Sequence, residues 1–138
     1  MEKKHTASDK GKKIAQLHWK IQQWKLQFQL MDNEIDFMKK LLDSNAFRSN
    51  IPNLFERLQD SKARLEEVHA RSEATRTRIS MHENNLGAED NAISADMTKM
   101  SDDLQLEVEE CMGNYHNLKS EIFNYTGSIL IMNKPELK

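Results

Sequence analysis

Glu66 and His69 are the two side chains whose types and spacing come nearest to a metal-binding motif. A Glu-x-x-His sequence places a carboxylate and an imidazole on one helix face, as in the di-iron sites of four-helix bundles. Those sites also draw carboxylates and histidines from other helices, and all of these groups point inward. Here the apolar stripe of the surrounding segment leaves Glu66 and His69 to one side of its centre. We therefore predict a surface pair, no bound metal and no cofactor.

His82 and Cys111 could also carry chemistry, and both fall on apolar stripes. His82 could titrate inside a bundle, but the prediction is a hydrogen-bonded histidine at the edge of the core. Cys111 has no local cluster of basic residues that would stabilise a thiolate, so we predict a buried, unreactive thiol. The chain contains no Gly-rich phosphate loop, nucleophile elbow or paired-carboxylate motif. We predict no catalytic residues and no enzymatic activity.

Composition bounds the class of protein. Among 138 residues there are four Gly and two Pro, too few turn-forming residues for a sandwich, a barrel or a Rossmann unit. The formal net charge is only −2, so the overall charge gives no indication that the protein binds nucleic acid or a membrane. A single cysteine cannot form an internal disulfide, and the longest apolar run, Ile129–Met132, is far too short to cross a bilayer. We expect a cytoplasmic protein without a transmembrane segment.

Apolar residues recur at alternating spacings of three and four in three segments, a pattern typical of helices that pack through heptad repeats. The first stripe consists of Ile14, Leu17, Ile21, Trp24, Phe28, Met31, Ile35, Met38 and Leu42. The second consists of Ile51, Leu54, Leu58, Ser61, Leu65, Val68, Ser72, Thr75, Ile79, His82 and Leu86. The third consists of Ile93, Met97, Met100, Leu104, Val108, Cys111, Tyr115, Leu118, Ile122 and Tyr125, with Ile129 and Met132 as a possible continuation.

The segments between the stripes, 43–50 and 84–91, carry helix-capping side chains and a helix-ending glycine, Gly87. Because these linkers are short, the sequence predicts an all-α fold: an elongated, antiparallel (up-down-up) three-helix bundle with coiled-coil-like heptad packing. We expect helices over about 8–44, 51–84 and 91–126, within a bundle of residues 13–127. Residues 1–12 are predicted to form a basic, disordered arm, and residues 128–138 a short tail or an extension of the third helix.

Large apolar residues of the first segment also lie outside its stripe. They are Trp19, Leu26, Leu30, Phe37 and Leu41. Their spacings of seven, four, seven and four place them together on the side of the helix opposite the core stripe. Two arrangements would hide this row within the protein itself: residues 128–132 could fold back over part of it, or the first helix could pack more centrally than the others. Otherwise the row is an exposed patch of a size that usually marks an interaction site.

These observations lead to a function by elimination. We predict a non-enzymatic structural or adaptor bundle that self-associates as a homodimer, or binds a partner helix, through these five partner-binding residues. The alternative is a nucleic-acid or anionic-membrane-surface binder that uses the lysine-rich N-terminal arm. Because this arm lacks Arg, and because the nearest aromatic residues belong to the helix, we regard nucleic acid as an unlikely partner.

Overall fold

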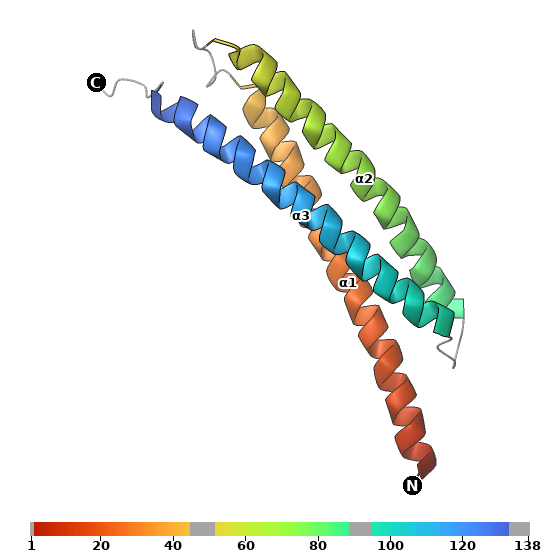
Figure 1. Cartoon of the computed structure of the whole chain (residues 1–138). Helices are drawn as coiled ribbons and strands as arrows, with labels where there is room; N and C mark the ends of the chain where they lie inside the picture. Colours follow the sequence, from red (N-terminus) through yellow and green to blue (C-terminus); the bar gives the residue numbers. More distant parts are fainter. Residues whose placement is uncertain (1, 45–51, 89–94, 133–138) are drawn as a thin grey trace. The chain divides into compact units, whose positions relative to one another are not determined.

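The fold is described by a computed structural model for residues 2–44, 52–88 and 95–132, with side chains over 11–44, 52–87 and 95–129. It is an all-α three-helix bundle of α1 (Glu2–Leu42), α2 (Leu54–Ala88) and α3 (Ala95–Met132) (Figure 1). The described residues contain no strand. The predicted fold class is therefore confirmed.

The chain divides into two compact units, and each of the three helices contributes one section to each unit. Unit 1 comprises Met1–Gln29 and Ser72–Glu110, and unit 2 comprises Leu30–Arg71 and Cys111–Lys138. Within each unit the sections of α1 and α3 run in the same direction and the section of α2 runs in the opposite one (Figure 1). The predicted up-down-up order is therefore found in each unit.

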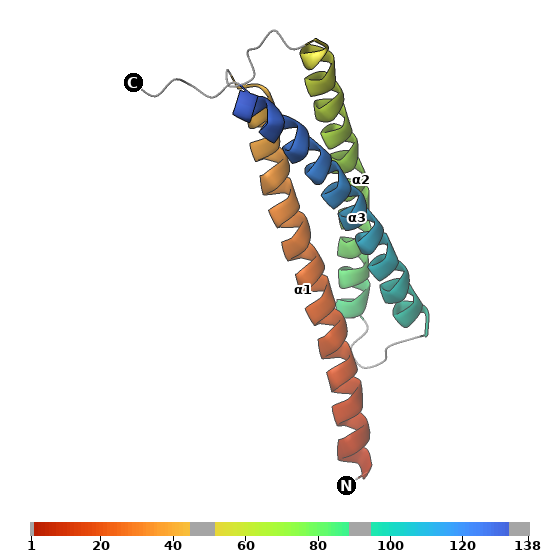
Figure 2. The ribbon, with the colours of Figure 1, turned by 60° about the vertical axis from the view of Figure 1, so that its left-hand side comes forward.

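One face of each helix section forms the core of unit 1. Its buried residues are Leu17, Ile21, Trp24 and Phe28 from α1, Ser72, Thr75, Ile79, His82 and Leu86 from α2, and Met97, Ser101, Leu104 and Val108 from α3. The indole N–H of Trp24 donates to Oε1 of Gln105 at 2.9 Å, which satisfies the one polar atom of this buried ring. The N-terminal part of α1 continues beyond the adjacent ends of α2 and α3 (Figure 2).

The core of unit 2 is more uniformly apolar. Its buried residues are Met31, Ile35, Met38 and Leu42 from α1, Leu54, Leu58 and Leu65 from α2, and Tyr115, Leu118, Ile122, Thr126 and Ile129 from α3. The hydroxyl of Tyr115 donates to the carboxylate of Glu34, so α1 and α3 are joined by a buried aromatic residue here as well. The hydroxyl of Thr126 donates to the carbonyl of Ile122 within α3 at 2.7 Å.

The stripes predicted on α1 and α2 are confirmed. Every α1 stripe residue from Leu17 to Leu42 is buried and Ile14 is half-buried. On α2 the stripe is buried except at Ser61 and Val68, which are half-buried, while Ile51 lies outside the described residues.

The stripe predicted on α3 is wrong at Met100 and at Tyr125, and its first member, Ile93, lies outside the described residues. Tyr125 is half-buried, and the neighbouring Thr126, 2% exposed, takes the core position. Met100 is 44% exposed, whereas the next residue, Ser101, is 1% exposed. The choice of Met100 followed size and polarity, but it required two successive spacings of four around Leu104. With Ser101 in its place, the buried residues from Met97 to Val108 keep the alternating spacings of four and three that hold one helix face against its neighbours.

The start of α1 differs from the prediction. The helix begins at Glu2 and therefore includes the segment that we predicted as a disordered arm. Lys, Glu and Ala, which are strong helix formers, make up much of this segment, so α1 can continue outward from its packed section.

The ends of α2 and α3 also differ from the predicted bounds. Asn53 has a φ of 62°, which a helix cannot include, so α2 begins at Leu54 rather than at residue 51. The helix passes through Gly87, which has no positive φ, and ends at Ala88 instead of residue 84. Burial of Ile129 accompanies the extension of α3 to Met132, so part of the predicted tail is helix.

Candidate functional site

The candidate site is the outer row of α1, the five residues Trp19, Leu26, Leu30, Phe37 and Leu41. In unit 1, Trp19 is 63% exposed and Leu26 is 53% exposed. In unit 2, Leu30 is 55% and Phe37 60% exposed, and Leu41 is half-buried. At about 100° per residue, the four exposed members point within roughly 40° of one another around the helix axis.

Contacts along the inner side of α1 fix its rotation, and thereby keep the outer row away from the other helices. In unit 1, Glu83 of α2 accepts from Nζ of Lys25 at 2.5 Å and from Nε2 of Gln22 at 3.0 Å. In unit 2, Lys39 pairs with Glu66 of α2, and Asp43 pairs with Lys62 of α2 at 2.5 Å.

The exposed apolar residues of α2 and α3 do not form comparable rows. Among the described side chains, the large ones are Phe55 and Met81 on α2, and Met100, Leu106 and Phe123 on α3. Phe55 and Met81 are separated by 26 positions with no exposed large apolar residue between them on α2, and the spacings on α3 of six and seventeen do not return to one helix face. Isolated exposed apolar side chains are ordinary on protein surfaces, whereas a row along one face requires an explanation.

Neither arrangement that would hide the row within the protein is found. Ser128–Met132 belongs to α3, with Ile129 buried in the core of unit 2, so this segment is not a separate cover for α1. Nor does α1 pack more centrally, because a central helix would not leave Leu30 and Phe37 more than half exposed.

Glu66 and His69, which the sequence predicts to be a surface pair, both contact α1 in unit 2. Glu66 is exposed and pairs with Lys39 of α1, and this ammonium lowers the pKa of the Glu66 carboxyl. His69 is half-buried, and its Nδ1 faces Oδ1 of Asp32 at 3.3 Å. The two residues of the motif therefore contact two different residues of α1.

The Asp32–His69 contact could not be found from the spacing of residues, because it depends on the register between α1 and α2. A carboxylate and an imidazole are suitable metal ligands, and within unit 2 this pair supplies two of them. The pair also joins α1 to α2, with the two ligand atoms 3.3 Å apart.

His82 is buried in unit 1, as its place on the stripe predicts, but its predicted hydrogen bond is missing at one nitrogen. Nε2 of His82 is shielded from solvent and has no hydrogen-bond partner among the described residues. Burial lowers the pKa of His82, and the nearby His18 lowers it further. The neutral imidazole is therefore the form that the core of unit 1 accommodates.

Cys111 is half-buried rather than buried, which corrects the prediction. It lines a shallow groove of about 390 Å³ in unit 2, together with Arg64 and Arg71 from α2. Each arginine pairs with a carboxylate, Arg64 with Glu121 and Arg71 with Glu67. Charged and amide side chains make up most of the lining, unlike the apolar pockets that bind most small molecules.

Glu34 is the centre of a charged cluster between α1 and α3 in unit 2. It accepts from the hydroxyl of Tyr115, and Nζ of Lys119 lies 3.1 Å from both of its carboxylate oxygens. The Tyr115 hydrogen bond and the Lys119 ammonium lower the pKa of Glu34 despite partial burial. Burial and the Glu34 carboxylate raise the pKa of Tyr115 well above its ordinary value. Both groups thus keep their usual charge states, a carboxylate and a neutral phenol.

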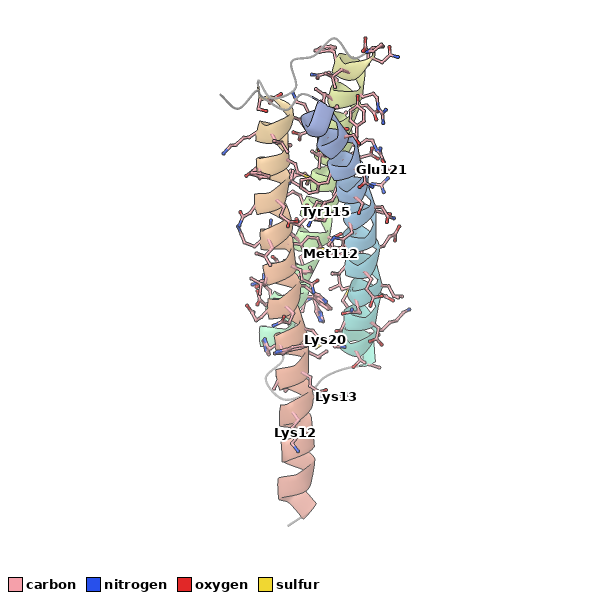
Figure 3. All side chains as sticks on the ribbon, turned by 90° about the vertical axis from the view of Figure 1, so that its left-hand side faces the viewer. Lys12, Lys13, Lys20, Met112, Tyr115 and Glu121 are labelled. Atoms are coloured by element: carbon pink, nitrogen blue, oxygen red, sulfur yellow. The ribbon has the colours of Figure 1, made fainter. Side chains whose placement is uncertain are left out.

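The lysine-rich segment belongs to α1. Lys12 and Lys13 are exposed, and both lie on the part of α1 that continues beyond α2 and α3 (Figure 3). Lys20 is half-buried. Within the described ranges, no helix combines the length and apolar character needed to cross a membrane.

Comparison with protein-family models, with curated proteins and with solved structures gave no match.

Proposed function

We propose that this protein is a non-enzymatic helical interaction module that binds a partner helix through the outer row of α1. The observation that supports the proposal is the exposure of four large apolar residues on one face of a helix whose opposite face builds the core. Covering one such side chain contributes about 1.5–3 kcal/mol to association, so burial of several of them would favour binding of a partner. We further propose that it acts in the cytoplasm, where its one cysteine would remain reduced.

The shape of the outer row indicates what kind of partner would fit it. Apolar side chains at spacings of seven and four residues form a narrow seam along one helix, as in the contact between two helices of a coiled coil. Gln23 and Asn33 continue the same spacing within the seam, and polar residues beside it, such as Gln27, would form the rim.

The direct test is the double substitution Leu26→Glu with Phe37→Glu. It changes one exposed residue in each unit without altering any core residue. The matched control is Met81→Glu with Phe55→Glu, which also changes one exposed apolar residue in each unit but on α2.

Both double variants should keep the helical circular dichroism and the melting temperature of the wild-type protein. Chemical cross-linking in the native cell should capture the wild-type and control proteins in complexes, whereas the α1 variant should remain uncomplexed. Equal capture of all three proteins would refute the proposal. Unfolding of the α1 variant alone would also contradict it, because buried carboxylates destabilise a fold strongly and the row would then belong to the protein's own packing.

A second candidate function rests on Lys12 and Lys13, which are exposed on the projecting part of α1. Such a basic helix end could contact phosphate groups of a nucleic acid or of an anionic membrane. Binding through these lysines should weaken steeply as salt is added, because counterions are released when lysines contact phosphates. Substitution of both lysines by Gln, with the outer row intact, separates this function from the first one.

A further inference from the structure

The outer row has the same spacing in both directions along α1. From Trp19 through Leu26 and Leu30 to Phe37, the steps are seven, four and seven residues. When two identical helices pair in antiparallel directions, a residue of one copy faces a residue of the other copy, and the two residue numbers add up to the same sum in every facing pair. If that sum is 56, Trp19 faces Phe37 of the second copy and Leu26 faces Leu30. All four exposed residues of the row then meet an apolar residue of the other copy.

We propose that the partner helix is α1 of a second copy of this chain, bound antiparallel about a two-fold axis near Phe28. This inference rests on the proposed function, since it names the partner for the same outer row. The two-fold arrangement closes after two copies, so it predicts a dimer rather than a fibre.

The distribution of charge along α1 favours the antiparallel direction. From Lys12 to Lys25 the helix carries four lysines and no acid, whereas from Leu26 to Met38 it carries three acids and no lysine. An antiparallel pair places the basic section of each copy against the acidic section of the other, and a parallel pair places like charges together. Charge complementarity of this kind selects orientation more than it adds affinity.

Polar residues within the seam match in the same register. Gln23 comes opposite Asn33, and the two copies of Gln27 lie on the same side of the seam close to the two-fold axis. Amide side chains can donate to and accept from each other, and polar residues inside a helix seam commonly fix its register. No like charges meet in any of these layers.

The first experiment measures the mass of the purified full chain by light scattering. The wild-type protein and the Met81→Glu, Phe55→Glu control should be dimers, and the Leu26→Glu, Phe37→Glu variant a folded monomer. A monomeric wild-type protein would overturn the self-pairing. If that monomer were still captured by another protein in cells through the outer row, the proposed function would stand while this inference failed.

The second experiment determines direction by single cysteines in a Cys111→Ser background under a mild oxidant. Gln27→Cys lies near the two-fold axis and should cross-link to its own copy. Gln16→Cys should not, because in the antiparallel pair the two copies of residue 16 are roughly 36 Å apart. A mixture of Gln16→Cys and Lys40→Cys proteins should give the mixed dimer, since those positions face each other. Self-cross-linking of Gln16→Cys would show a parallel pair and overturn the proposal.

Discussion

Unit 1 and unit 2 are built from sections of the same three helices, yet different residues fill their cores. Among the described side chains, four of the five buried polar residues belong to unit 1, namely Ser72, Thr75, His82 and Ser101, and Thr126 belongs to unit 2. On α2, the core positions of unit 2 are leucines, whereas those of unit 1 include serine, threonine and histidine. The core of unit 1 gains its large side chains from α1, where Trp24 and Phe28 are buried.

This difference has an energetic consequence. A polar atom shielded from water without a hydrogen-bond partner costs about 1–3 kcal/mol. Among the described residues, two such atoms lie in unit 1, Nε2 of His82 and Oγ of Ser101, against one in unit 2, the hydroxyl of Tyr125. Thr126 in unit 2 satisfies its hydroxyl within its own helix. We therefore expect unit 1 to be the less stable of the two and to open first, although its helices are continuous with those of unit 2.

Leu65 and Ser72 provide the sharpest test, because they are seven residues apart on the same face of α2 and both are 0% exposed. Leu65→Ala removes a large apolar side chain from unit 2 and should cost about 2–5 kcal/mol of unfolding free energy. Ser72→Ala removes only a hydroxyl from unit 1 and should cost no more than about 1.5 kcal/mol. Urea unfolding of the two variants measures both values. Equal costs would contradict the distinction between the two cores.

His82 should make unit 1 sensitive to acid. Its pKa in the folded protein is lowered by burial and by His18, so between that pKa and about 6.5 the unfolded chain binds more protons than the folded one. Stability is therefore greatest above about pH 6.5 and falls as the pH decreases. We expect the unfolding free energy to fall between about pH 6.5 and pH 5, as measured by urea unfolding at a series of pH values.

His82→Leu is the variant that isolates this effect, because leucine fills a similar volume without a titrating group. Its unfolding free energy should vary less with pH over the same range. Hydrogen exchange should place the acid-induced opening in α2 residues 72–88 rather than 54–71. Equal acceleration in both sections would show that the two units open together.

Tyr115 tests the charged cluster of unit 2. Tyr115→Phe keeps the buried ring but removes the hydrogen bond to Glu34, and should cost about 0.5–1.5 kcal/mol at neutral pH. The folded-state pKa of Glu34 is lowered, so its contribution to stability is present above its ordinary pKa and is lost as the pH falls through the lowered one. The cost of Tyr115→Phe should therefore shrink in acid. In unit 1 the Trp24–Gln105 bond joins two neutral groups and should not show this dependence.

The sequence predicted the helices and most of the core because burial on a packed helix follows a short period. That period alone predicts the burial of the α1 stripe from Leu17 to Leu42. It also predicts the exposure of Trp19 and Phe37 on the opposite side of the helix. Met100 was predicted wrongly because its large apolar side chain was preferred to the smaller Ser101. The helical spacing places Ser101 in the core, and Ser101 is the residue that is buried.

Contacts between helices were not predictable in the same way. Glu34 meets Tyr115, and Asp32 meets His69, only because neighbouring helices adopt one particular register. That register depends on packing along the whole length of each section, and no local spacing encodes it. The helix limits at Asn53 and Gly87 were also uncertain from sequence, since both residues can either end a helix or lie beside its end.

The smallest expected effects come from two matched ion pairs that join α1 to α2, Lys25–Glu83 in unit 1 and Lys39–Glu66 in unit 2. Exposed ion pairs contribute little because water screens both charges and two long side chains must be ordered. Glu83 is the less exposed carboxylate, its side chain 27% exposed, and it also accepts from Gln22, so Glu83→Gln should cost up to about 1 kcal/mol at low salt and less at high salt. Glu66 is exposed, and Glu66→Gln should leave the unfolding free energy unchanged within measurement error at either salt concentration. A larger effect for Glu66 than for Glu83 would reverse the expected order, and would show that unit 2 depends on its surface charges more than unit 1 does.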